Sequence, residues 1–370
     1  MGFFRPTPKF LFLSFLILST GAAYMYMYVS NNGVELSPKV SEEIVIGALA
    51  GEKENWDSLA EAEKEQSRRL ATLKAYCEKN SVDPSQTQVK SHLVFLENIQ
   101  TAYCYVPKAG CTTMKTLFYN LEHNKTERSI SISHAEFFKN KDSYTARHEH
   151  TRRWIHLQRF KTLGSYSKEE ASLRLATYRK IIVVRDPLER LASAWINKFV
   201  EMPKIGRDFW WTMELNHGLR TYRERNRPDK SSKSKVKEEG TFNDTKPVSF
   251  RDFLFAVSKK VFDNEHWISI NRLCLPCQIN YDFIAHTDTV ASDVRLFLKK
   301  NNITANEDIL PEQRPRQAND DNVFGGIYGQ VPIQDILPLR DIFQEDFDMF
   351  GYSFEQDLAK IREGKAKAKG

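Results

Sequence analysis

The chain has little cysteine and lacks the motifs that mark several common functional classes. Five cysteines in 370 residues are too few for a fold held together mainly by disulfides. The one C-x-x-C motif, Cys274–Cys277, has no second pair to complete a four-cysteine zinc site. Arg152 replaces the second histidine of the H-E-x-x-H zinc motif that would begin at His148. Because no nucleic-acid-binding motif is present either, we predict neither a metal site nor a nucleic-acid partner.

The composition instead indicates one folded domain with a basic surface. Hydrophobic residues make up 41% and aromatic residues 12% of the chain, which is enough for a sizeable core. The net charge of +6 and the isoelectric point near 8.9 favour anionic partners, such as acidic glycans. The serine-rich basic stretch 220–237 is typical of a solvated loop, and it would also attract an anionic glycan.

An uncharged segment near the N-terminus, residues 10–29, is long enough to cross a membrane. As a helix, its 20 residues would span about 30 Å, the thickness of a bilayer core. Arg5 and Lys9 precede the segment, so the positive-inside rule leaves residues 1–9 in the cytosol and the rest of the chain in a lumen. A cleaved signal peptide is the alternative, with small residues at 21–23 as the cleavage site. The length of the segment favours the anchor.

The polar residues 30–90 are predicted to form a stem, with an exposed helix over residues 52–79. Cys77 in this stem would link two chains into a homodimer, pair within its own domain or stay free. In an oxidising lumen the two C-x-x-C cysteines would form a disulfide, either with each other or with Cys104 or Cys111. Three N-x-[ST] triplets predict glycosylation in the lumen, at Asn124, Asn243 and Asn302.

The stretch 102–121 combines a short apolar strand with a helix, joined by a loop suited to an anion. Residues 102–106 are an apolar run, and apolar residues then recur at helical spacing. Backbone N–H groups at the helix start, two hydroxyls and a lysine would surround a bound oxyanion. The register that aligns Lys115 with a Walker A lysine has Ala109 and Met114 in place of both glycines, so the nucleotide-kinase motif is absent. The residues predicted to bind the anion are Pro107, Lys108, Ala109, Gly110, Cys111, Thr112, Thr113 and Lys115.

A second strand and helix follow further along the chain. A β-branched run, residues 181–184, suits a strand buried on both faces. Asp186 is placed to cap the next helix, and Glu189 has capping-box spacing. Apolar residues form one stripe of this helix, so Arg190 is expected on the opposite face. An arginine at the strand end and a serine two turns into the helix can then converge on one phosphate. The residues predicted for this second anion site are Arg185, Asp186, Pro187, Arg190 and Ser193.

These two motifs, in this order, resemble the Golgi carbohydrate sulfotransferases of the chondroitin 4-O, dermatan 4-O and HNK-1 type. In that family the first loop reads P-K-x-[AG]-C-T-x-x-K, which Pro107–Lys115 matches. The second motif reads R-x-P-x-x-R-x-x-S, which Arg185–Ser193 matches. A third stretch, 264–293, carries the H-W and L-C-x-P-C pattern of the family, with Ala285 and Asp288 replacing the usual glycine and glutamate.

The resemblance implies an α/β fold in which a parallel sheet carries a P-loop-like binding site. It also implies 3′-phosphoadenosine 5′-phosphosulfate (PAPS) as the sulfuryl donor and a glycan hydroxyl as the acceptor, most simply the 4-O of GalNAc in chondroitin or dermatan, without a metal. Lys108 would neutralise the departing 5′-phosphate oxygen, and Arg185 with Ser193 would bind the 3′-phosphate. The implied lumenal domain covers 91–356, and the implied location is the Golgi membrane. The lysine-rich tail at 357–370 is predicted to be disordered.

The group that takes the proton of the acceptor hydroxyl is left open by the sequence. His156 and His266 are the main candidates, with His134 and His150 behind them.

Two other functions fit part of the pattern. A lumenal glycan kinase would use the same loop for ATP, but it would need the Walker glycines and an acidic residue for magnesium. A non-catalytic glycan-binding protein would explain the basic charge but not Lys108 together with Arg185 and Ser193.

Overall fold

The computed structural model describes residues 60–80, 88–124, 155–156, 158, 160–204, 209–226, 246–312 and 321–367. The chain divides into two compact units, residues 1–64 and 65–370, and the fold below is that of the second unit. The predicted membrane span at 10–29 and the candidate residues His134, His150 and Asn243 lie outside the described residues. Within the described part, no helix combines the length and the apolar character that a membrane crossing requires.

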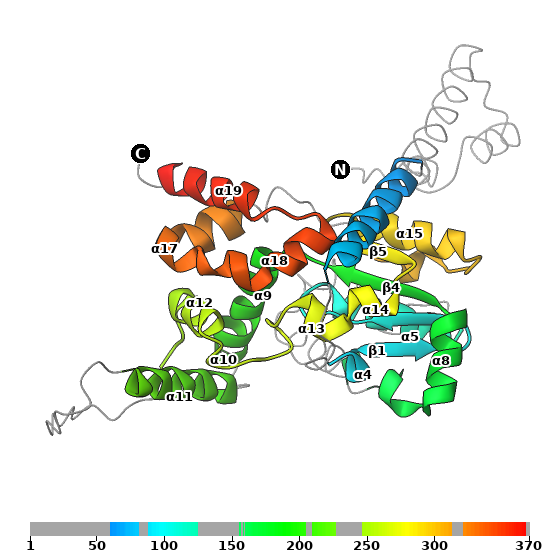
Figure 1. Cartoon of the computed structure of the whole chain (residues 1–370), viewed down its shortest axis with the longest axis horizontal. Helices are drawn as coiled ribbons and strands as arrows, with labels where there is room; N and C mark the ends of the chain where they lie inside the picture. Colours follow the sequence, from blue (N-terminus) through cyan, green and yellow to red (C-terminus); the bar gives the residue numbers. More distant parts are fainter. Residues whose placement is uncertain are drawn as a thin grey trace, which may run out of the picture. The chain divides into compact units, whose positions relative to one another are not determined.

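A five-stranded sheet lies at the centre of the unit (Figure 1). Its strands run in the order β3 (Lys161–Thr162), β1 (Leu93–Leu96), β2 (Thr101–Cys104), β4 (Arg179–Val184) and β5 (Phe283–His286). Strands β2, β4 and β5 are parallel, as predicted, whereas β1 is antiparallel to both β2 and β3. The sheet is therefore mixed and not wholly parallel. The reason is the short turn at 97–100, which joins β1 to β2 as a hairpin and so requires antiparallel pairing.

Helices surround the sheet and extend beyond one end of it, where α11, α12, α17, α18 and α19 lie (Figure 1). A helix at residues 60–79 precedes the first strand. The labelled helices are α4 (Val89–His92), α5 (Cys111–Glu122), α8 (Lys168–Thr177), α9 (Pro187–Trp195), α10 (Met202–Lys204), α11 (Phe209–Arg225), α12 (Phe250–Ser258), α13 (Ile270–Cys274), α14 (Pro276–Ile279), α15 (Val290–Lys300), α17 (Ile333–Ile336), α18 (Pro338–Phe350) and α19 (Phe354–Lys367). A π-helical turn, η3 (Ile196–Glu201), continues α9.

Two hydrophobic clusters form the core. One joins the inner strands to α13, and the other joins α9, α11, α12, α18 and α19. The β-branched residues predicted for a doubly covered strand, 181–184, are fully buried in β4. The apolar positions predicted for the face of α5 are also buried. Local apolar periodicity therefore located both elements that lead into the predicted anion sites.

The helix at 60–79 differs from the exposed stem helix expected there. From residue 65 onward it packs within the same unit as the sheet, with Leu73 buried. Arg69 is buried as well, and its Nη1 donates to Asp293 Oδ2 at 2.7 Å. Because a buried arginine needs such a partner, these two residues fix the helix against the sheet domain.

The cysteine pairing settles alternatives that the sequence leaves open. Cys104 pairs with Cys274, and Cys77 pairs with Cys277 within the same chain. Cys274 and Cys277 are not bonded to each other, and Cys111 is a free thiol. The Cys77–Cys277 bond ties the helix at 60–79 to α14, so Cys77 is not available to link two chains.

The C-terminal segment also differs from the expected disordered tail. Residues 354–367 form α19, in which Leu358 and Ile361 are buried. A few apolar residues at helical spacing are sufficient to order this helix, because they pack into the same core cluster as α18. The expectation of disorder is thus wrong for residues 357–367.

Candidate functional site

The junction between β2 and α5 is an open turn. Lys108 and Gly110 both have left-handed backbone, with φ of 69° and 71°. Gly110 directly precedes α5, and no side chain of the described residues caps that helix. The N–H groups of its first turn therefore face outward without a side-chain acceptor, next to the half-buried Thr112 and the exposed Thr113. A helix N-terminus in this state attracts an anion, because its N–H groups and dipole both favour negative charge.

The junction between β4 and α9 is closed by its own side chain. Asp186 Oδ1 accepts hydrogen bonds from the N–H groups of Leu188 and Glu189, at 2.9 and 3.0 Å. Pro187 is the first residue of the helix, as predicted. Glu189 does not complete the expected capping box, and its carboxylate instead accepts from Arg185 Nε at 3.0 Å. The charge of Arg185 competes more strongly for this carboxylate than the backbone N–H of Asp186.

The two junctions lie side by side. Strands β2 and β4 are neighbouring parallel strands, with Cys104 opposite Ile182, so the loops that follow them leave the same edge of the sheet. Arg185 Nη1 donates to the backbone oxygen of Lys108 at 3.4 Å. Two sequence motifs almost eighty residues apart are thus brought into direct contact.

Arg190 is buried beneath these loops and is not on the open face of α9, contrary to expectation. Its Nε donates to the oxygen of Pro107 at 2.9 Å, Nη1 to that of Ile268 at 2.6 Å and Nη2 to that of Glu265 at 2.9 Å. Each bond satisfies a backbone carbonyl that strand and helix geometry leave unpaired. Arg190 therefore holds the first anion loop and the 265–268 loop in fixed positions.

Lysine side chains make the area around the open turn electropositive. Lys115 Nζ lies 3.4 Å from the ring centroid of Tyr105, and Lys198 Nζ lies 4.8 Å from that of Trp211. Burial lowers the pKa of Lys108 to about 8, and the nearby charges of Lys198 and Arg185 act in the same direction. Burial also lowers the pKa of Lys115. A bound dianion would relieve this crowding of positive charge.

Both leading histidine candidates lie next to this cluster. The Nε2 of His156 and the Oγ1 of Thr112 are 3.0 Å apart, within hydrogen-bonding distance. Burial and then the charges of Lys115 and Lys198 lower the pKa of His156 to about 4. Burial, followed by the charge of Lys198, likewise holds the pKa of His266 well below its usual value. Both rings are therefore neutral near pH 7 and are able to accept a proton.

Two further residues at the site were not found from the sequence. Glu265 Oε2 lies 3.2 Å from His92 Nε2, and this contact is the main reason that the pKa of Glu265 is lowered to about 2. His92 is buried, and its Nδ1 lies 2.9 Å from the oxygen of Tyr105. His266 is fixed through its own Nδ1, which lies 2.7 Å from Asn264 Oδ1. The only sequence signal was the acidic residue next to His266, Glu265, because its partner His92, 173 residues earlier, is brought near it only by the fold.

The remaining predicted residues lie at the two junctions or apart from them. Pro107 and Ala109 are buried in it, Cys111 is half-buried at the start of α5, and Ser193 is half-buried on α9. Asn124 and Asn302 are exposed at the ends of α5 and α15. Among the described residues, no group of three or more histidine, cysteine or acidic side chains has the geometry to hold a metal ion.

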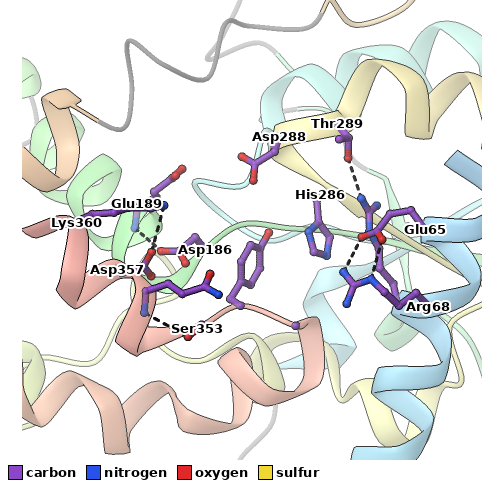
Figure 2. Close-up of a pocket in the computed structure, with 14 residues that line it drawn as sticks. Glu65, Arg68, Asp186, Glu189, His286, Asp288, Thr289, Ser353, Asp357 and Lys360 are labelled. Carbon is purple, nitrogen blue, oxygen red and sulfur yellow. Dashed lines mark hydrogen bonds and ion pairs between the residues drawn. The ribbon is translucent and has the colours of Figure 1, made fainter. Parts of the chain in front are cut away.

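A polar cavity of about 280 Å³ lies behind the second junction (Figure 2). Asp186 and Asp357 face each other at one side of it, and Glu65 with Arg68 lies at the other. Burial raises the pKa of Asp186 well above its usual value, and the adjacent Asp357 raises it further. Burial also raises the pKa of Asp357, to about 6. The two carboxyl groups therefore share a proton near neutral pH.

The model of the sulfotransferase family matches residues 91–353, so the chain belongs to that family and is a sulfotransferase. Carbohydrate sulfotransferase 12 of Xenopus laevis is 27% identical over 82% of this chain and 72% of its own length. Carbohydrate sulfotransferase 11 of Rattus norvegicus is 28% identical over 71% of this chain and 67% of its own length. Carbohydrate sulfotransferase 10 of the same organism is 28% identical over 77% of this chain and 74% of its own length. No solved structure matches the chain. These matches confirm the family that the loop motifs indicated.

Proposed function

We propose that the protein transfers the sulfuryl group of PAPS to a hydroxyl of a glycan, most simply the 4-O of GalNAc in chondroitin or dermatan. The observation that carries this proposal is the contact between the open start of α5, with Lys108, and the end of β4, with Arg185. An anion site and a second cationic group side by side suit a nucleotide with phosphate groups at both its 5′ and 3′ positions. The matched relatives are named carbohydrate sulfotransferases, which supports a sugar as the acceptor.

The two junctions would bind opposite ends of the donor. The N–H groups of the first turn of α5, from Cys111 to Thr113, hold the phosphosulfate, and Lys108 lies beside the oxygen between phosphorus and sulfur. Arg185 and Ser193 bind the 3′-phosphate, which PAPS has and ATP lacks. Fixing both ends orients the sulfur toward the acceptor, and such positioning accounts for much of the rate in loose, in-line transfers.

In the transfer step the acceptor oxygen forms a bond to sulfur as the bond from sulfur to the 5′-phosphate oxygen breaks. The departing phosphate oxygen gains negative charge, which the ammonium of Lys108 neutralises. The acceptor hydroxyl loses its proton to a base. The products are the sulfated glycan and 3′-phosphoadenosine 5′-phosphate (PAP).

His156 is the general base in this scheme. Its Nε2 adjoins Oγ1 of Thr112 in the anion loop, and the ring is neutral near pH 7. His266 is mostly buried, and its Nδ1 is held by Asn264, so it suits a positioning role at the wall of the site. If replacement of His266, and not of His156, abolishes the base-dependent limb of the pH profile, these two roles are exchanged.

The proposed location is the lumenal side of the Golgi membrane. Residues 10–29 have the length and lack of charge of a signal anchor. The exposed positions of Asn124 and Asn302 suit glycosylation of a lumenal domain. Treatment of the expressed protein with a glycosidase would reduce its apparent mass if these asparagines are modified.

The experiment that tests the function is a binding titration of the purified full-length protein with PAPS and ATP, followed by transfer of radiolabelled sulfate. Binding of PAPS but not ATP is expected, because Arg185 and Ser193 would bind the 3′-phosphate that ATP lacks. Equal binding of both would favour a kinase, and binding of neither would favour a non-catalytic protein. Transfer across a panel of chondroitin, dermatan, glucuronate-terminated and GalNAc-terminated glycans, with disaccharide analysis, would then identify the hydroxyl.

A further inference from the structure

Helix α11 presents an apolar patch to solvent at its N-terminal end. Phe209, Trp210 and Met213, called the α11 patch below, are 43%, 47% and 46% exposed. Met213 lies three and four residues after Trp210 and Phe209, so the three side chains lie within about 100° of one another around the helix axis. The other large exposed apolar residues of the described chain, Leu173 and Leu337, stand alone. A contiguous exposed patch of this kind marks an interaction surface, whereas single exposed residues do not.

The opposite face of α11 is fixed against the core. Trp211, Leu215 and Leu219 are buried in the second hydrophobic cluster. Gly218 lies so close to Val261 that an added Cβ would come within 2.7 Å of its Cγ1. The helix therefore has no room to rotate, and the patch stays on the surface.

The α11 patch adjoins the proposed reaction centre. The ring centroid of the patch residue Trp210 lies 4.0 Å from that of the buried Trp211, whose own centroid lies 5.4 Å from that of His266. The ammonium of Lys198, in the π-helical turn after α9, lies 4.8 Å from the ring of Trp211. The patch is thus one aromatic side chain away from the histidine and lysine cluster.

Positive charge continues along the same face of the helix. His217 lies one turn beyond Met213, and Arg220 lies one turn further, where its Nη2 donates to His217 Nδ1 at 2.7 Å. In the last turn, Arg223 Nη2 pairs with Asp252 Oδ1 at 3.2 Å. The face therefore carries aromatic side chains at its start and Arg220 two turns further on, a cation that can pair with a carboxylate of an acidic polymer.

The chemistry of this face selects one class of ligand. A pyranose ring has an apolar face of C–H groups that packs flat against an aromatic side chain, and uronate carboxylates pair with arginine. We propose that the α11 patch and Arg220 bind an acidic polysaccharide chain, on the sugars that neighbour the acceptor residue. The proposal rests on the proposed function, because it assigns the acceptor side of the same site. It adds that the enzyme recognises several sugars of a chain and not the acceptor sugar alone.

The test compares the full-length protein with three variants. In Phe209→Ala/Trp210→Ala the patch is removed, in Trp210→Phe an aromatic ring is kept, and in Leu173→Ala an exposed apolar residue on α8 is removed as a control. Affinity for unsulfated chondroitin polymer is measured with PAP bound, alongside affinity for PAPS itself. The double variant is expected to bind chondroitin about tenfold more weakly or worse, as for a buried aromatic anchor in an interface. Trp210→Phe should retain most of the affinity, and Leu173→Ala should match the wild type.

Each other outcome overturns the inference. Unchanged chondroitin affinity in the double variant, or no chondroitin binding by the wild type, removes the patch as a polysaccharide site. A change from dimer to monomer in the double variant, seen by sedimentation, would assign the patch to a second copy of the chain. Affinity for PAPS should be equal in all four proteins. Failure of the wild type to bind PAPS would instead refute the proposed function, so the two failures are distinguishable.

Discussion

The two strand-to-helix junctions of the sheet have the same topology but opposite chemistry. At the start of α5 no side chain in the described part of the chain caps the helix, and the preceding residues Lys108 and Gly110 take left-handed backbone. At the start of α9 the carboxylate of Asp186 accepts the first N–H groups. The difference shows that a helix N-terminus next to a sheet edge is not by itself an anion site, because a capping residue already occupies the second one.

The closed junction contributes side chains where the open junction contributes backbone. Arg185, at the strand end, pairs with Glu189 through its Nε and contacts the backbone oxygen of Lys108 in the first loop through its Nη1. The 3′-phosphate would then meet a guanidinium and the hydroxyl of Ser193. The sulfuryl end would meet backbone N–H groups. Substitutions at the open junction should therefore reduce turnover, whereas substitutions at the closed junction should reduce affinity for the nucleotide.

The largest effect is expected from Lys108→Ala at the open junction. Loss of a preorganised cation next to the departing oxygen should reduce kcat by ~10²-fold or more, with the fold intact. The measurement is sulfate transfer at saturating PAPS, with circular dichroism as the check on folding. Lys168→Ala, an exposed lysine at the start of α8, is the control and should be fully active. Turnover near the wild-type value would contradict the catalytic role of Lys108.

The pH profile refines this prediction, because the pKa of Lys108 is lowered to about 8. The cation is present below that pH and is lost above it, so kcat/KM of the wild type should fall as the pH rises through 8. A neutral His156, with its pKa lowered to about 4, sets the acidic limb. Lys108→Arg should be active but should keep its charge to higher pH. An identical alkaline limb in Lys108→Arg would assign that limb to another group.

A smaller effect, on affinity alone, is expected from Arg185→Ala at the closed junction. Removal of charge-assisted hydrogen bonds to the 3′-phosphate should weaken PAP binding by about tenfold to a hundredfold. Adenosine 5′-phosphosulfate lacks this phosphate, so its affinity should change little. Isothermal titration with both nucleotides separates the two cases. Equal weakening for both ligands would show that Arg185 acts through the Lys108 loop and not through the 3′-phosphate.

Sequence reasoning located the strands, loops and apolar helix faces of both junctions, because these features follow from local periodicity and spacing. It failed for groups whose position depends on distant partners. Arg190 was placed on an open face, but the carbonyls of Pro107 and Glu265 draw it into the interior. Lys198 lies in a π-helical turn, which shifts the register that a regular helix would give.

The same dependence on distant partners explains why the packing of the helix at 60–79 and the pairing of strand β1 were not predicted. Apolar residues are sparse in the helix at 60–79, and its packing depends on the Arg69–Asp293 ion pair and on a disulfide between residues 200 positions apart. Neither partner is visible in the local pattern. The sheet was predicted as parallel because the motifs describe only β2 and β4, whereas the hairpin that adds antiparallel β1 carries no motif.

The smallest effect concerns the closed junction itself, through Asp186→Asn. In the fold, burial raises the pKa of Asp186, and that of the adjacent Asp357 rises to about 6. The folded pair therefore takes up a proton that the unfolded chain releases, so the contribution of this pair to stability is largest below about pH 4 and falls as the pH rises through 6. Asparagine keeps the capping oxygen and donates a permanent N–H to Asp357. Urea unfolding should show Asp186→Asn more stable than the wild type by about 1–2 kcal/mol at pH 8 and equal to it at pH 4.

Asp186→Ala is the matched control, because it removes the cap together with the titrating group. It should be less stable than Asp186→Asn at both pH values by about 1 kcal/mol, the usual contribution of a capping side chain. If the asparagine and alanine variants lose stability equally at pH 8, the negative charge of Asp186 is what closes the junction. The contrast with the uncapped start of α5 would then be one of charge and not of hydrogen bonding.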